Sequence, residues 1–151
     1  MSLIDGSVTG IDHVGISVRD LDGAIDFYVQ HFSCRVASRE QHTGQGVEEA
    51  MLRFHGDTGT GVAIQLLASM REGSVIDRFL QRHGPGIQQI ALRVTDIEAV
   101  TTSLTRAGLT VTGEQPIAGG EGTLVDFVHP RSTEGVLVEL VQRDATESAP
   151  E

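Results

Sequence analysis

The sequence predicts an α+β protein made of two tandem βαβββ modules, each with a small curved sheet. The first observation is an internal repeat: residues 11–24 and 87–100 align without a gap, apolar position against apolar position. The second is that the far ends of the two copies also match. Residues 63–67 and 137–141 both have the pattern of a strand with one polar residue among apolar ones. A repeat that shows at both ends predicts that the modules share one fold.

The first module spans about residues 9–68. Alternating apolar residues predict a strand over 9–18 and then a helix to about His31. Asp20 or Asp22 is expected to cap this helix, because a short carboxylate accepts hydrogen bonds from unpaired amides of the first turn. Three more strands are expected over residues 35–41, 47–54 and 61–68, with a turn at 44–46 between the first two.

A linking helix over about 74–83, beginning at Ser74 and ended by Gly84, joins the modules. The second module spans about residues 87–142, and residues 143–151 form a polar tail. Its expected elements are a strand over 87–94, a helix over 97–107 capped by Gly108, and strands near 109–112, 123–129 and 135–142. Because the modules are half the size of an ordinary domain, residues 1–151 are expected to form a single domain.

Composition excludes several classes of function. The net charge is −10, all 11 cations are arginines, and no basic run is present, which argues against nucleic-acid binding. The sequence contains no run of about 18 apolar residues, so no membrane span is expected. The N-terminus does not resemble a secretion signal. Cys34 is the only cysteine, so no intrachain disulfide is possible. A cytoplasmic location is therefore expected.

Four polar residues occupy strand positions where an inward side chain is expected: His13 and Gln89 on the first strands, Gln65 and Glu139 on the last. Burying a polar group costs free energy unless it is paired. That cost at four equivalent places favours a shared site for a metal or a polar ligand. His13 and Glu139 are the strongest pair, because imidazole and carboxylate commonly bind divalent cations. For either residue taken alone, a structural or chance inward polar group is the favoured interpretation, and only the repeat favours a site.

Two adjacent glutamates, Glu48 and Glu49, lie on the predicted third strand, so their side chains face opposite sides of the sheet. One is expected in solvent, and the other faces the cavity, where a carboxylate beside a metal can act as a general base. For either residue alone, a solvated surface glutamate is an alternative. His31, His42, His55 and His83 fall in predicted loops or helix ends and are assigned no role.

Several short runs carry a resemblance to the vicinal oxygen chelate superfamily, which includes glyoxalase I, extradiol dioxygenases and bleomycin-resistance proteins. The resemblance covers about residues 11–142 and is strongest to the methylmalonyl-CoA epimerases. The matching runs are Asp12-His13-Val14-Gly15-Ile16, Phe27-Tyr28, Gln45-Gly46-Val47, Ser74-Val75-Ile76 before Phe79-Leu80, and His129-Pro130 followed by Gly135-Val136-Leu137-Val138-Glu139-Leu140.

The resemblance implies that the two modules form a cupped, curved mixed sheet around a central site. It places the metal ligands at His13, Gln65, Gln89 and Glu139, with Co, Mn, Mg or Ni as the divalent cation. It also implies that Glu49 is the catalytic base, with Glu139 as the second proton donor. The expected reaction removes and returns a proton at the carbon between a thioester and a carboxylate of an acyl-CoA. A homodimer is implied in the same way.

One departure from the family pattern bears on function. The epimerases have two histidines where this chain has Gln88-Gln89, so Gln89 replaces a ligand. A site with one imidazole, one carboxylate and two amides binds soft or borderline metals less tightly. It also argues against an extradiol dioxygenase. Two alternatives therefore stay open. One is an isomerase or cyclase of specialised metabolism that acts on another carbonyl compound and can work without a metal. The other is a non-catalytic resistance protein that binds a small molecule.

Overall fold

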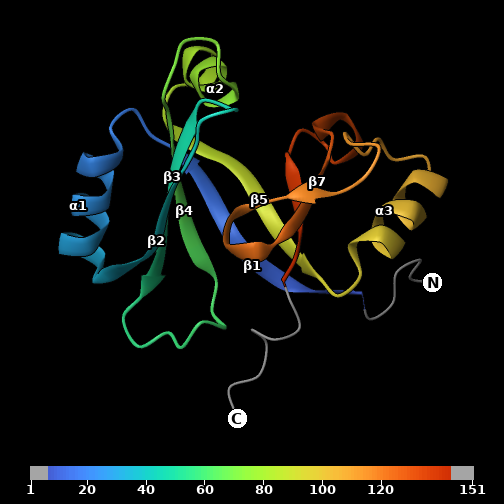
Figure 1. Ribbon diagram of the computed structural model, residues 1–151, viewed down its shortest axis with the longest axis horizontal. Coiled ribbons are helices and arrows are strands. Elements are labelled where there is room, and N and C mark those ends of the chain that lie inside the picture. The colour runs from blue at the N-terminus through green and yellow to red at the C-terminus, as the bar shows by residue number, and fades with distance from the viewer. Residues whose placement is uncertain (1–6, 144–151) are drawn as a thin grey trace. The chain divides into compact units, whose positions relative to one another are not determined.

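The computed structural model describes residues 7–143, which divide into two compact units. Residues 13–88 make the first unit, and residues 89–143 with 7–12 make the second. The helices of the described chain are α1 (Leu21–Phe32), α2 (Val75–His83) and α3 (Ile97–Arg106). The strands are β1 (Val8–Ser17), β2 (Cys34–His42), β3 (Val47–Phe54), β4 (Ala63–Ser69), β5 (Gly86–Val94), β6 (Ile117–Ala118), β7 (Leu124–Val128) and β8 (Val138–Gln142). This order of elements confirms the predicted α+β class and the repeated βαβββ pattern (Figure 1).

Strand pairing follows the same plan in both units. In the first unit the order is β2-β3-β4-β1, with β1 parallel to β4 and the other pairs antiparallel. In the second unit the order is β6-β7-β8-β5, with β5 parallel to β8 and the other pairs antiparallel. Each unit is therefore a mixed sheet, in which the first strand of the repeat lies beside the last.

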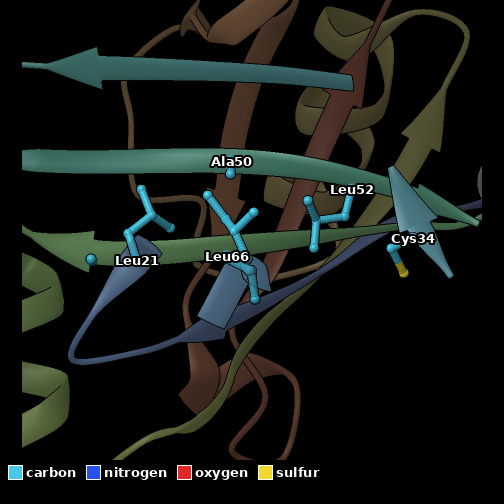
Figure 2. Packing of buried hydrophobic residues seen from close by; sticks show 7 residues of the cluster. Leu21, Cys34, Ala50, Leu52 and Leu66 are labelled. Atoms are coloured by element: carbon cyan, nitrogen blue, oxygen red, sulfur yellow. The ribbon is translucent and has the colours of Figure 1, made fainter. Parts of the chain in front are cut away.

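One face of the first unit is apolar because alternate strand residues point toward α1. Leu52 and Leu66, from neighbouring strands, are fully buried and pack with Leu21 of the helix. Figure 2 shows these side chains gathered with Ala50 and Cys34. In the second unit α3 has the same role, since Ile97 and Val100 are buried against strand residues such as Val94, Val128 and Leu140.

The start of α2 at Ser74 agrees with the sequence prediction. The Ser74 hydroxyl accepts a hydrogen bond from the Asp77 amide at 3.0 Å, and Asp96 caps α3 through the Ala99 amide at 3.1 Å. The predicted cap of α1 is wrong. Asp20 occupies the N-cap position without a side-chain cap bond, and the carboxylate of Asp22 accepts from Arg39 at 2.6 Å instead.

The predicted strand near residues 109–112 is also wrong. Only Val111 forms a bridge, to Val128, and the short strand β6 lies a few residues later, inside the predicted loop. The Thr112 amide donates to the Phe127 carbonyl at 2.9 Å, but the Phe127 amide donates to the Asp126 carboxylate at 2.8 Å rather than back to Thr112, and the pairing goes no further. The described residues contain no helix that is long and apolar enough to cross a membrane.

The loop between β3 and β4 is organised by one carboxylate. Asp57 accepts hydrogen bonds from the amides of Gly59 at 2.8 Å and Gly61 at 3.0 Å, and Arg53 donates to its other oxygen at 3.2 Å. These backbone hydrogen bonds, with the nearby guanidinium, lower the pKa of Asp57 to about 2. An unfolded aspartate has a pKa of about 3.9. Ionised Asp57 therefore favours the folded state above about pH 4, and this contribution is lost as the pH falls toward 2.

We expect Asp57→Asn to lower the midpoint of chemical denaturation at pH 7, because the amide weakens the bonds to the Gly59 amide and to Arg53. The difference between variant and wild type should shrink as the pH falls from about 4 toward 2, where the wild-type carboxyl becomes protonated. Urea denaturation at a series of pH values measures this. Glu72→Gln on the exposed surface is the control, and an equal difference at all pH values would contradict the assignment.

Candidate active site

The polar residues of the first unit lie on the sheet face opposite α1. Gln65 on β4 is paired with Gly15 of β1 and with Met51 of β3. Residues two apart on a strand share a face. His13 and Glu49 are therefore diagonal neighbours of Gln65, on its own face. The strand register thus brings together three of the residues selected from the sequence, and both His13 and Gln65 are buried.

The second unit repeats this arrangement with two residues. Glu139 of β8 is paired with Ala91 of β5, which places Gln89, two residues earlier, on the same face as the glutamate. Both side chains are buried, and the Gln89 amide nitrogen donates to Glu139 Oε2 at 2.6 Å. A buried charge is stable only with such a partner. The sequence prediction that Gln89 and Glu139 point inward together is thus consistent with the geometry of this unit.

Glu49 has the surroundings of a candidate general base. Its Oε2 accepts a hydrogen bond of 2.8 Å from the Gln65 amide nitrogen, and His42 Nε2 lies 3.5 Å from the same oxygen. Its side chain is 13% exposed, so a small molecule has access to a carboxylate that is otherwise held in place. The neighbouring Glu48 points to the other face, where Arg39 lies 3.9 Å from it. The structure thus separates the two adjacent glutamates as the alternation predicted.

The β2–β3 turn fixes where Glu49 stands. Gly46 has φ of +70°, and a Cβ there would lie 2.6 Å from the Arg71 side chain, so only glycine fits. The Arg71 guanidinium donates to the carbonyl oxygens of Thr43 and Gly44, both at 3.0 Å. The Met70 amide donates to the Gly46 carbonyl at 2.7 Å. These contacts define the start of β3, three residues before the carboxylate.

Each unit taken separately offers donor atoms of the kinds that bind divalent cations. His13 and Gln65 offer an imidazole nitrogen and an amide oxygen, and Gln89 and Glu139 offer an amide oxygen and a carboxylate. In both pairs the glutamine nitrogen faces a glutamate, an orientation in which the amide oxygen can serve as ligand. Imidazole and oxygen ligands together suit a borderline or hard divalent ion. The buried Cys34 is unsuited to nucleophilic chemistry, because burial raises the pKa of its thiol.

Sequence reasoning missed a buried ion-pair cluster around Asp12. Asp12 Oδ1 accepts from Arg93 Nε at 3.1 Å and from Arg143 Nε at 2.9 Å, and Oδ2 accepts from Arg143 Nη2 at 2.8 Å. The carboxylate has no exposed area, whereas both arginines reach toward the surface. No local signal identifies it, because its partners lie 81 and 131 residues away along the chain.

Sequence reasoning also missed a group of three potential ligands. Glu40, His42 and Glu49 place one donor atom each within 4.8 Å of one another. The sequence does contain a signal for this group. The turn at 44–46 sets the register of the hairpin, and that register puts all three residues on one face of the sheet.

Comparison with known proteins identifies the family of the chain. A family model described as the glyoxalase/bleomycin resistance protein/dioxygenase superfamily matches residues 12–127. The chain belongs to this superfamily, as the sequence resemblance predicted.

Epimerases are prominent among its relatives. The ethylmalonyl-CoA/methylmalonyl-CoA epimerase of Cereibacter sphaeroides is 34% identical over 87% of this chain and 96% of its own. The crystal structure of methylmalonyl-CoA epimerase from Mycobacterium tuberculosis is similar with a TM-score of 0.87 and 40% identity, over 97% of this chain and 95% of that one. A methylmalonyl-CoA epimerase solved with methylmalonyl-CoA and NH4+ has a TM-score of 0.87 and 36% identity, over 95% of this chain and all of that one.

Removing the Asp12 carboxylate should destabilise the protein. We expect Asp12→Asn to lower the free energy of unfolding by about 3 kcal/mol, because Arg93 and Arg143 both lose the buried carboxylate between them, although Arg143 keeps Glu121 at 3.6 Å. Asp22→Asn is the matched control, since it breaks a pair with Arg39 that is largely exposed, and it should destabilise the protein much less than Asp12→Asn does. Urea denaturation at pH 7 measures both. Equal effects of the two substitutions would show that the Asp12 cluster is not a stabilising centre.

Proposed function

We propose that this protein is a methylmalonyl-CoA epimerase-like isomerase. The proposed reaction removes and returns a proton at the carbon between a thioester and a carboxylate. The observation that carries the proposal is Glu49, a partly exposed carboxylate that Gln65 holds on the sheet face opposite α1. Epimerases related to this chain over most of its length support it.

Glu49 is proposed as the base that takes the proton from carbon. The electron pair of the C–H bond moves toward the thioester oxygen and gives an enolate, and a second acid returns a proton to the opposite side of the carbon. The hydrogen bond from Gln65 holds Glu49 Oε2 in one orientation. A positioned general base of this kind contributes about 10²–10⁴-fold to the rate.

Glu139 is proposed as the second acid and as a cation ligand, together with His13, Gln65 and Gln89. Support comes from the burial of all four side chains and from the Gln89–Glu139 hydrogen bond. A divalent cation bound to these residues would stabilise negative charge that develops on the thioester oxygen, an effect of several kcal/mol. The proposed substrate is an acyl-CoA such as methylmalonyl-CoA or ethylmalonyl-CoA, because relatives carry those names. The implied homodimer and cytoplasmic location stay predictions.

A second candidate is an enzyme of the same superfamily acting on another carbonyl compound. Gln89 in place of the expected histidine favours it, because the ligand set then carries fewer strong donors. A probable lactoylglutathione lyase of Vibrio cholerae, 31% identical over 86% of this chain and 88% of its own, shows that related sequences have other assigned activities. Proton abstraction beside a carbonyl is common to both candidates, so Glu49 keeps its proposed role in each.

The proposal predicts deuterium incorporation at C2 of methylmalonyl-CoA in deuterated water. The protein would be treated with a chelator and then assayed by NMR or mass spectrometry with added Co2+, Mn2+, Mg2+ or Ni2+. Exchange should depend on metal, and His13→Gln should weaken that dependence. No exchange with any metal would reject the epimerase and direct the search to other carbonyl substrates.

The identity of the base is tested by a matched pair of variants. We expect Glu49→Gln to slow exchange by about 10²–10⁴-fold, because an amide cannot accept the proton. Glu48→Gln changes the adjacent residue in the same way but on the other face, and it should leave the rate within a few-fold of wild type. Similar rates for both variants, or normal exchange in both Glu49→Gln and Glu139→Ala, would refute the proposed roles.

A further inference from the structure

A second potential metal site lies on the β2–β3 hairpin. Glu40 is directly opposite Glu49 in the register of the two strands, and His42, two residues after Glu40, shares their face. Like charges directly opposite on neighbouring strands repel and destabilise the pair. A cation bound by both carboxylates would remove that cost, and His42 supplies a third donor at the same place.

The distances fit ligands around an ion better than direct hydrogen bonds. His42 Nε2 lies 3.5 Å from Glu49 Oε2 and 3.8 Å from Glu40 Oε2, whereas hydrogen bonds in proteins span about 2.7–3.2 Å. Two ligands that are each about 2.1 Å from a tetrahedral ion stand roughly 3.4 Å apart. All three donor atoms lie within 4.8 Å of one another, so small side-chain rotations complete the geometry.

We propose that Glu40, His42 and Glu49 bind a divalent transition-metal ion of the Zn2+ type. One imidazole and two carboxylates favour Zn2+ or Co2+ over Mg2+, which prefers six oxygen ligands. The three side chains are 33%, 29% and 13% exposed respectively, so the ion can enter from solvent and keep a water molecule as its fourth ligand. Two of the ligands flank the turn that Arg71 braces, which reduces the ordering that binding requires.

The site includes the proposed catalytic base, and this gives binding a consequence. A cation on Glu49 Oε2 draws electron density from the whole carboxylate and makes it a weaker base for the substrate proton. Occupation of the hairpin site therefore inhibits the proton transfer. This effect on activity rests on the proposed function, whereas ion binding itself does not, because it needs only the three hairpin residues.

Binding is tested with Co2+, which reports its ligands by visible absorption, and by calorimetry. The proteins are wild type, His42→Gln, His13→Gln and the matched control His55→Gln, an exposed histidine just beyond the other end of the same hairpin. We expect His42→Gln to lose one bound ion per chain, or to bind it at least tenfold more weakly. His55→Gln should bind as wild type does, and His13→Gln should retain the hairpin ion.

Equal binding by His42→Gln and His55→Gln would overturn the site, as would loss of all binding in His13→Gln. Glu40→Gln is a second variant, expected to weaken the same ion at least tenfold, and circular dichroism confirms that each variant is folded. A spectrum that is unchanged by Co2+ in wild type would also reject the site.

The inhibitory effect has a separate measurement. Zn2+ should inhibit C2 exchange in wild type, and His42→Gln should need at least tenfold more Zn2+ for the same inhibition. Equal Zn2+ sensitivity of the two proteins would overturn the inhibition. If no protein shows exchange, the proposed function fails, but the Co2+ experiment still decides whether the hairpin site exists.

Discussion

The constraint on which the rest of the structure depends is the alternation of side chains along paired strands. In each unit the first strand of the repeat runs parallel to the last, and this register decides which residues share a face. One face is packed by a helix, α1 in the first unit and α3 in the second. The polar residues that sequence analysis selected lie on the other face. A slip of one residue would move them into the helix interface, where their charge and hydrogen-bonding groups would be costly.

Each inward polar residue is tolerated because it has a specific partner. Gln65 donates to Glu49 and Gln89 donates to Glu139, so both units place a glutamine amide beside a carboxylate. These contacts stabilise groups that would otherwise be poorly solvated, and they also orient oxygen atoms for chemistry. The same physical requirement therefore explains stability and candidate function. It also explains why the repeat is visible in the sequence at these positions.

Sequence reasoning found the contacts between residues of one module and missed contacts between residues that are far apart along the chain. Glu49 and Gln65 belong to predicted strands of one module, and the alternation of Glu48 and Glu49 already separated their faces. The Asp12 cluster could not be predicted, because Arg93 and Arg143 are distant in sequence and arginine is common on surfaces. The wrong strand near residues 109–112 has a similar cause: the side chain of Asp126, further along the chain, accepts from the Phe127 amide, which would otherwise pair with this segment.

The sequence by itself determined the α+β class, the repeated order of elements and the inward polar positions. These depend on periodicity and on turn residues, which act over a few residues of chain. Only the tertiary structure decided which side chains meet. It places His42 beside Glu49 and Arg143 beside Asp12. It also pairs the Asp22 carboxylate with Arg39 instead of with an amide of the helix. The physical reason is that hydrogen bonds and ion pairs depend on distances of a few ångströms. Those distances are set by strand register and packing, not by spacing along the chain.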